Sequence, residues 1–169
     1  MATNKDALYQ FQSRLSNRLH STEEHSTAAH WLAVEVSGSG FVLPLSQSGE
    51  IFPWAEPHPV PYTKNWFLGV ANLRGALCGV VSLSKYFQLD SSMGRTKSSL
   101  LDKRLIGFHP TFELNTVLVV DRLAGLKSRE QLIATDVATR YQDQQGRDWQ
   151  EIDLRLLTHD ASFVSIAAT

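Results

Sequence analysis

The sequence predicts a mainly β protein, built as a barrel or a sandwich. From Trp31 onward the apolar residues alternate with a period of two, which is the pattern of a strand with one buried face. Short apolar runs recur along the rest of the chain, and turn-forming glycine or proline residues separate most of them. A helical period is clear only over residues 5–20, so few helices are expected.

Residues 1–28 are predicted to form an N-terminal helical extension and linker ahead of a β domain at 29–169. Within residues 5–20, apolar side chains recur at spacings of three and four, as on one face of an amphipathic helix. This apolar stripe consists of Leu8, Phe11, Leu15 and Leu19. Residues 21–29 are polar, which is typical of a linker. The stripe is expected either to pack against its own β domain or to dock on a partner.

Residues 31–45 predict a β-hairpin at the start of the β domain. Apolar and polar residues alternate in its first strand, and Ser-Gly-Ser-Gly at 37–40 supplies the turn. Pro44 has no backbone N–H to donate to a neighbouring strand. The second strand is therefore expected at an edge of its sheet or at a bulge.

Further strands are predicted at the later apolar runs. These runs are 51–52, 69–71, 77–83, 104–108, 114–120 and 131–134. The polar stretch 90–99 is the longest interruption among them, so we expect it to divide the β domain into a first lobe at about 29–90 and a second lobe at about 100–169. Apolar residues such as Trp149 and Phe163 are expected to fix the C-terminal part to the core.

Charge and hydropathy argue against nucleic acid or a membrane as the partner. The chain has 169 residues, with 16 Lys and Arg against 17 Asp and Glu. This balance gives no field of one sign, and residues 31–63 contain no Lys or Arg to accompany their aromatic rings. The longest uncharged run, 36–49, is shorter than the about 18 apolar residues of a membrane-spanning helix. Asp6, Arg14 and Arg18 interrupt the apolar run that a signal peptide needs, so we expect a cytoplasmic protein without direct membrane insertion.

The sequence predicts a non-enzyme that carries no metal or cofactor. The six histidines contain no pair at the spacing of a metal-binding helix, and the single Cys78 is expected in the core. There is no Gly-x-Ser-x-Gly motif, and the glycines at 38–40 join two strands instead of opening a phosphate-binding helix. Two alternatives stay open. One is a small hydrolase that uses a serine and a histidine, and the other is a β-barrel that holds a small ligand.

Residues 60–75 form the most informative stretch for function. Asn72-Leu73-Arg74-Gly75 places a polar pair just before a tight turn. An arginine flanked by apolar strand residues needs an acidic partner wherever it is partly buried. Residues 31–73 contain three acids, and Glu50 is the natural candidate among them. The alternative to a binding role for Arg74 is a purely structural ion pair.

The motif Gly-Val-Ala-Asn-Leu-Arg-Gly at 69–75 makes the sequence similar to a known family, the CheW-like domains of chemotaxis coupling proteins. The resemblance includes Val-Pro at 60–61, Val-Val-Asp at 119–121 and Ile-Asp-Leu at 152–154, so it covers nearly everything after residue 30. The N-terminal stripe and Trp66 look more like the coupling proteins of type IV pilus chemosensory systems than those of flagellar chemotaxis.

The resemblance implies two packed five-stranded, SH3-like β-barrels and a non-catalytic adaptor. Such an adaptor couples the cytoplasmic tip of a chemoreceptor to the regulatory domain of a CheA-type histidine kinase, here in control of pilus-driven twitching motility. By similarity, an ion pair lies beside the receptor-binding groove and its neighbours shape that surface. The implied protein-binding residues are Glu50, Gly69, Val70, Asn72, Leu73, Arg74 and Gly75. The following strand departs from the family pattern, because residues 79–83 lack the usual proline and aspartate.

Overall fold

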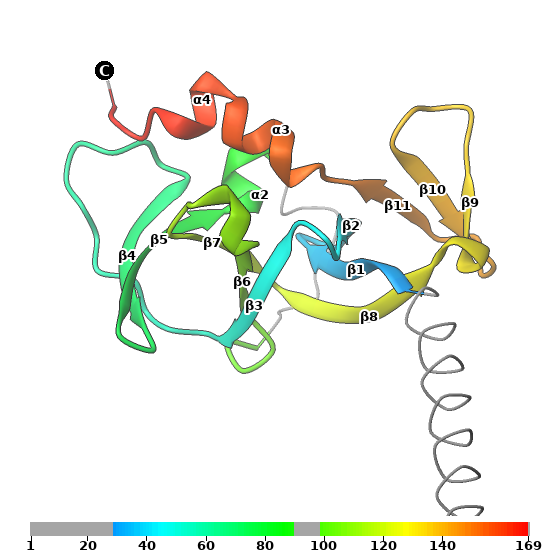
Figure 1. Ribbon diagram of the computed structural model, residues 1–169, viewed down its shortest axis with the longest axis horizontal. Coiled ribbons are helices and arrows are strands. Elements are labelled where there is room, and N and C mark those ends of the chain that lie inside the picture. The colour runs from blue at the N-terminus through cyan, green and yellow to red at the C-terminus, as the bar shows by residue number, and fades with distance from the viewer. Residues whose placement is uncertain (1–28, 90–98, 169) are drawn as a thin grey trace, which may run out of the picture.

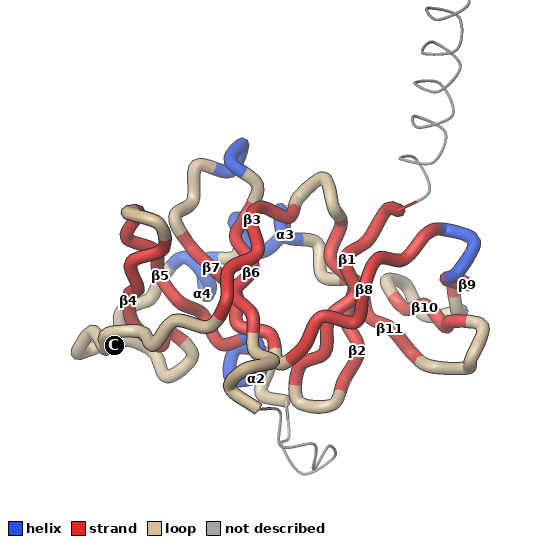
Figure 2. The backbone as a smooth tube through the Cα atoms, turned by 90° about the horizontal axis from the view of Figure 1, so that it is seen from below, coloured by secondary structure: helices blue, strands red, loops and turns tan. Residues whose placement is uncertain are grey.

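The computed structural model describes residues 29–89 and 99–168. It consists mostly of strands in two curled sheets that lie side by side (Figure 1), which confirms the mainly β prediction. Figure 2 shows the sheet of β3 to β7 on the left and the sheet of β1, β2 and β8 to β11 on the right. The predicted helix at 5–20 lies outside the described residues.

One sheet has six strands, in the order β8-β1-β2-β11-β10-β9. Its strands are β1 (Ala29–Val36), β2 (Ser39–Pro44), β8 (Arg122–Ser128), β9 (Leu132–Ala134), β10 (Arg140–Asp143) and β11 (Asp148–Glu151). The two edge strands, β8 and β9, are joined by the 3₁₀ turn η2 (Arg129–Gln131). The sheet therefore curls so that only a three-residue turn separates its two edge strands, and the short β9 adds a strand to the five that the resemblance implied.

The other sheet has five strands, in the order β3-β6-β7-β5-β4. Its strands are β3 (Ser48–Pro53), β4 (Phe67–Leu73), β5 (Ala76–Ser82), β6 (Arg104–Phe108) and β7 (Thr116–Val120). Strands from early and late in the chain pair in parallel in both sheets, β5 with β7 here and β2 with β11 in the six-stranded sheet. The two sheets therefore do not coincide with the expected lobes 29–90 and 100–169, since each sheet combines strands from both ranges.

Pro44 closes a strand in the interior of its sheet, which corrects the expectation of an edge or a bulge. β2 pairs with β1 on one side and with β11 on the other. The pairing with β11 involves only Phe41 and Val42. Because Pro44 is the last residue of β2 and lies beyond that pairing, no neighbouring strand needs the N–H that proline lacks.

Alternate residues of the strands enter different parts of the core. In β1, Trp31 and Ala33 point into the interior that the curled six-stranded sheet encloses. Leu32 and Val34 face the opposite way, toward a central cluster between the two sheets. The interior of the five-stranded sheet is filled by Ala71, Leu73, Cys78, Val80, Leu105, Val117 and Val119, which confirms Cys78 as a core residue. Strict alternation thus lets one strand serve two packing layers.

Three short helices cover one side of the central cluster (Figure 1). They are α2 (Leu83–Tyr86), α3 (Leu154–His159) and α4 (Ala161–Val164). Phe163 stacks on Trp66 with ring centroids 5.8 Å apart, which fixes the C-terminal segment to the core as expected. Among the helices in the described residues, none has the length and apolar character needed to traverse a bilayer.

Candidate protein-binding site

The β4–β5 hairpin ends in a two-residue turn formed by Arg74 and Gly75. Leu73 pairs with Ala76, so only these two residues lie between the strands. Both have positive φ angles, 51° and 90°, as a type I′ turn requires. The backbone N–H of Gly75 donates to the side-chain oxygen of Asn72 over 2.9 Å. The Asn-Leu-Arg-Gly sequence therefore fixes the turn that carries the Arg74 side chain.

The predicted ion pair between Arg74 and Glu50 is formed. Glu50 lies in β3, and Arg74 follows β4, the strand at the opposite edge of the five-stranded sheet. The Arg74 guanidinium also lies over the ring of Phe52, 5.8 Å from its centroid. The pair therefore links the two edges of the curled sheet from the outside.

Both partners of this pair are exposed to water. The side chain of Arg74 is 73% exposed and that of Glu50 is 46% exposed. Exposed ion pairs contribute only about 0–1 kcal/mol to stability, because water and salt screen them. The pair therefore adds little to the stability of the fold. Both charged groups remain accessible to a partner.

Gly69 allows a close backbone approach instead of offering a contact surface. Its φ is +128°, and an added Cβ would overlap the carbonyl oxygen of His58. Its neighbour Val70 exchanges two backbone hydrogen bonds with His58, of 2.9 and 2.7 Å. The segment around His58 thus covers the outer edge of β4, and only glycine fits beneath it.

The seven predicted site residues lie together on β3, β4 and the β4–β5 turn, but they are not equally accessible. Leu73 is buried in the sheet interior and Val70 is half-buried. Asn72 is exposed. Together with Glu50, Arg74 and Gly75, Asn72 forms the accessible part of the predicted site.

An apolar depression next to Glu50 was missed by sequence reasoning. It has a volume of about 280 Å³ and lies between β3, β5 and the β6–β7 connection. Its lining includes Phe52, Phe108, Leu114 and the carboxylate residue Glu113. These residues come from distant parts of the chain that only the sheet pairing brings together. No local pattern in the sequence therefore indicates the depression.

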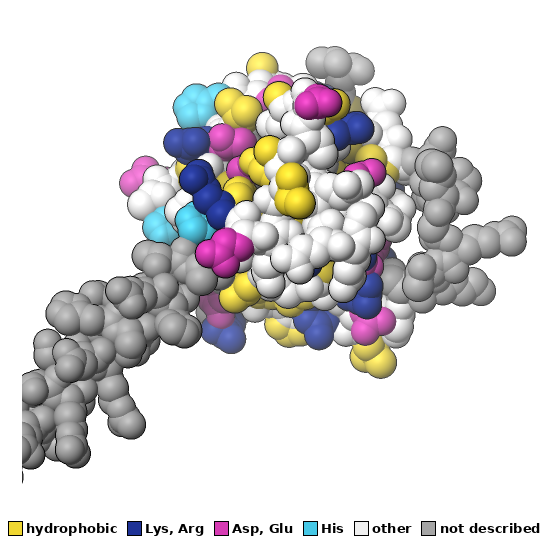
Figure 3. Space-filling model, turned by 90° about the vertical axis from the view of Figure 1, so that its right-hand side faces the viewer, with side chains coloured by type: hydrophobic (Ala, Val, Ile, Leu, Met, Phe, Trp, Pro, Cys, Tyr) yellow, Lys and Arg dark blue, Asp and Glu magenta, His cyan; other side chains and the backbone are white. Residues whose placement is uncertain are grey.

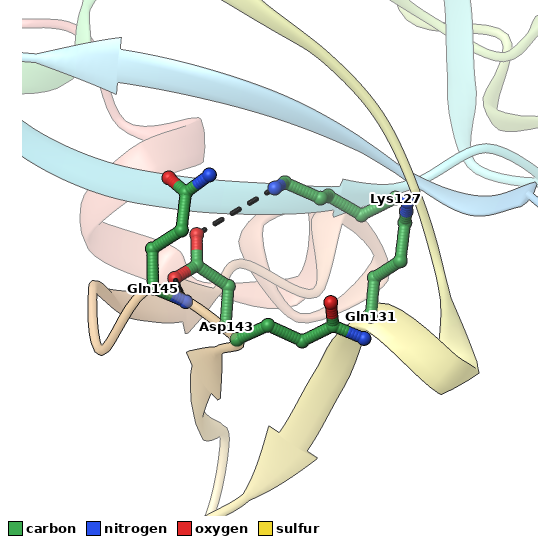
Figure 4. A pocket seen from close by; sticks show the side chains of 5 residues that line it. Lys127, Gln131, Asp143 and Gln145 are labelled. Atoms are coloured by element: carbon green, nitrogen blue, oxygen red, sulfur yellow. Dashed lines mark hydrogen bonds and ion pairs between the residues drawn. The ribbon is translucent and has the colours of Figure 1, made fainter.

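The carboxylate of Asp143, in the six-stranded sheet, is held by neighbouring groups of the fold, in contrast to the exposed Glu50 (Figure 4). Asp143 is buried and accepts hydrogen bonds from the indole N–H of Trp149, at 2.9 Å, and from two backbone N–H groups of its own turn. Lys127 reaches it at 3.6 Å. These donors, led by the indole, hold the pKa of Asp143 below its usual value. A small cavity of about 110 Å³ lies beside Asp143, and in the described part of the chain no buried side-chain nitrogen or oxygen lacks a hydrogen-bond partner.

Glu35 is the second carboxylate with a fixed role in the six-stranded sheet. Arg122 donates two hydrogen bonds to it, of 3.0 and 2.7 Å, and Arg147 pairs with it at 2.6 Å. The hydrogen bonds from Arg122, with those from Arg147, lower the pKa of Glu35 even though partial burial opposes the shift. Charges of both signs alternate with apolar side chains on this end of the molecule (Figure 3).

The described residues offer no support for the hydrolase alternative. The imidazoles of His109 and His159 form their side-chain hydrogen bonds with threonine hydroxyls, a backbone N–H and a backbone carbonyl, not with a serine. In the part of the chain that the structure describes, no three His, Cys, Asp or Glu side chains are grouped to hold a metal ion.

The sequence of this chain matches a known protein family. The model of the CheW-like domain matches residues 30–134, more than half of the chain. Protein PilI of Pseudomonas aeruginosa is 25% identical over 114 residues, which are 68% of this chain and 61% of PilI. The match thus spans less than two thirds of the length of PilI.

A solved structure shares the fold at low sequence identity. The scaffolding protein TtCheW of Thermoanaerobacter tengcongensis superposes with a TM-score of 0.54 at 16% identity. The superposition covers 75% of this chain and 89% of that protein. This structure shows the same fold, and the match of the CheW-like domain model over more than half of the chain shows that the chain belongs to the CheW-like domain family.

Proposed function

We propose that this protein is a non-catalytic adaptor of chemosensory signalling, which couples the cytoplasmic tip of a chemoreceptor to the regulatory domain of a CheA-type histidine kinase. The observation that carries the proposal is the exposed Glu50–Arg74 pair on the edge of a CheW-like fold. Such a pair adds little to stability, whereas a charged pair beside an apolar surface sets the register of a protein partner.

The similarity to PilI supports a pathway that controls type IV pili and twitching motility. Recruitment to receptor arrays at the inner membrane would then occur through the receptor, since the adaptor itself acts from the cytoplasm. A binding function also agrees with the interiors of both sheets, which are filled by side chains and so do not favour a small ligand inside a barrel.

The test uses the full chain with two purified fragments, a receptor-tip helical hairpin and a kinase regulatory domain. We expect Arg74→Glu to weaken binding of at least one fragment about tenfold or more, because the reversed charge repels Glu50 and removes the donor at the site. The matched control is Arg129→Glu, an exposed arginine in η2, the turn between the edge strands of the six-stranded sheet.

Circular dichroism and thermal unfolding must show that both variants remain folded. If the unmodified chain retains neither fragment at tens of micromolar, the adaptor proposal is wrong. If the folded Arg74→Glu variant binds both fragments as tightly as the control, Arg74 does not belong to the site.

A further inference from the structure

We propose that the apolar depression beside Glu50 is a specificity pocket, which takes one apolar side chain of a protein partner while Glu113 pairs with a lysine or arginine next to that side chain. We call this depression the Glu113 pocket; it is lined by Glu50, Phe52, Phe108, Glu113, Leu114 and Val117, among others. The inference rests on the proposed adaptor function and defines the chemistry of the partner at the same surface.

The size and lining of the Glu113 pocket suit a side chain better than a metabolite. Its volume of about 280 Å³ falls just below the about 300–1,000 Å³ of sites that enclose drug-sized ligands. Phe52 and Leu114 are partly buried at its wall, and Val117 is buried beneath it. An inserted aliphatic or aromatic group would cover this apolar surface, as the anchor residues of protein interfaces do.

The charge at the rim selects the residue next to the anchor. Glu113 is exposed and, among the described residues, forms no ion pair. Glu50 lines the same depression, and its one described cation, Arg74, lies at the β4–β5 turn. Two carboxylates with a single arginine leave a net negative rim, which favours a cationic side chain over an acidic one.

The carboxylate of Glu113 is presented by a fixed loop. Glu113 ends the 3₁₀ turn η1 (Pro110–Phe112) with a φ of 51°, and its backbone N–H donates to the carbonyl of Pro110 over 3.0 Å. Phe112 packs edge-on against Phe108 with ring centroids 6.1 Å apart. His109 accepts the backbone N–H of Thr111 within the same turn. A loop held in this way loses little conformational freedom on binding.

A direct test needs no natural partner. Acetyl-Leu-Arg-amide and the matched acetyl-Leu-Glu-amide are titrated into the full chain, and the methyl NMR signals of Leu114 and Val117 are followed. We expect saturable shifts with the arginine peptide and about threefold or more weaker binding in Glu113→Gln, as for loss of one exposed ion pair. Equal shifts from both peptides, or no shift from either, would overturn the inference.

A second test uses the receptor-tip and kinase fragments. Glu113→Lys should weaken the binding of one fragment about tenfold, whereas Glu130→Lys, at an exposed glutamate in η2, should leave that binding unchanged. If the unmodified chain binds neither fragment, the adaptor function fails, and the peptide titration still decides the pocket. If the unmodified chain binds and folded Glu113→Lys binds equally well, the pocket inference alone is wrong.

Discussion

The two sheets curl in a similar way but use their charged groups differently. In the six-stranded sheet, Asp143 is only 7% exposed and Trp149 donates to it, while Trp31 and Tyr141 both donate to Glu151. In the five-stranded sheet the interior is apolar, and the carboxylate of Glu50 meets its arginine at the surface.

The difference separates carboxylates that the fold requires from those that a partner can use. A buried acceptor cannot be removed without leaving its donors unpaired, so Asp143 is committed to stability. An exposed pair exchanges its partner for water at little cost, so Glu50 and Arg74 are free to change partners. The five-stranded sheet is accordingly the surface on which we place binding.

The largest expected effect is on the six-stranded sheet. Trp149→Ala should lower the free energy of unfolding by about 3–5 kcal/mol, because it removes a buried ring and leaves a cavity. Guanidinium unfolding measures the change. Leu156→Ala, at a 70% exposed leucine, is the control and should stay within about 0.5 kcal/mol. Similar losses in both variants would contradict the assignment of Trp149 to the core.

Removal of the buried carboxylate should have the next largest effect. Asp143→Ala should cost about 1–3 kcal/mol, since the indole N–H of Trp149 loses its acceptor. Combination with Trp149→Phe in a double-mutant cycle, measured by chemical unfolding, should show strong coupling between the two sites. Additive losses would mean that the hydrogen bond does not stabilise the sheet.

Acid should weaken the six-stranded sheet through the same groups. The pKa values of Asp143 and Glu35 lie lower in the folded protein than in model compounds. As the pH falls, the unfolded chain therefore binds protons at a higher pH than the folded protein does. The stability that the two ionised carboxylates contribute is complete at neutral pH and is lost progressively below about pH 5. Unfolding titrations between neutral and acidic pH should show a shallower loss in Asp143→Asn. An unchanged slope in that variant would remove Asp143 from the effect.

The smallest expected effect is on the five-stranded sheet. Glu50→Gln and Arg74→Ala should each change the free energy of unfolding by about 0–1 kcal/mol, and added salt should reduce even that. Thermal unfolding at low and high salt measures the change. A loss comparable to that of Asp143→Ala would show that the pair holds the sheet closed, and the contrast between the two sheets would disappear.

Strands with regular alternation could be predicted from the sequence, whereas irregular ones could not. The hairpin at 31–45 and the run at 104–108 match β1, β2 and β6 closely. β8 was missed because Gly125, with a φ of +103°, and a register shift opposite it break the alternation. The helices α3 and α4 have only six and four residues, too few for a helical period to appear.

Part of the candidate site was predictable because charge is scarce near it. Arg74 needed an acid, and residues 31–73 contain only three, so Glu50 was the natural candidate. Glu113 and Leu114 offered no such constraint. They reach the same surface only because β6 pairs with β3 and β7 pairs in parallel with β5, and long-range pairing of this kind leaves no local signal.

The parallel pairing of β2 with β11 also constrains how the chain acquires its structure. The β1–β2 hairpin forms from neighbouring residues, but its contacts with β11 join residues as far apart as Trp31 and Glu151, 120 positions along the chain. Contacts between residues so far apart in the sequence form slowly, because the long loop between them must first be closed. During synthesis, the β1–β2 hairpin therefore leaves the ribosome with both edges unpaired, and its β2 edge stays unpaired until β11, the last strand described, has been made.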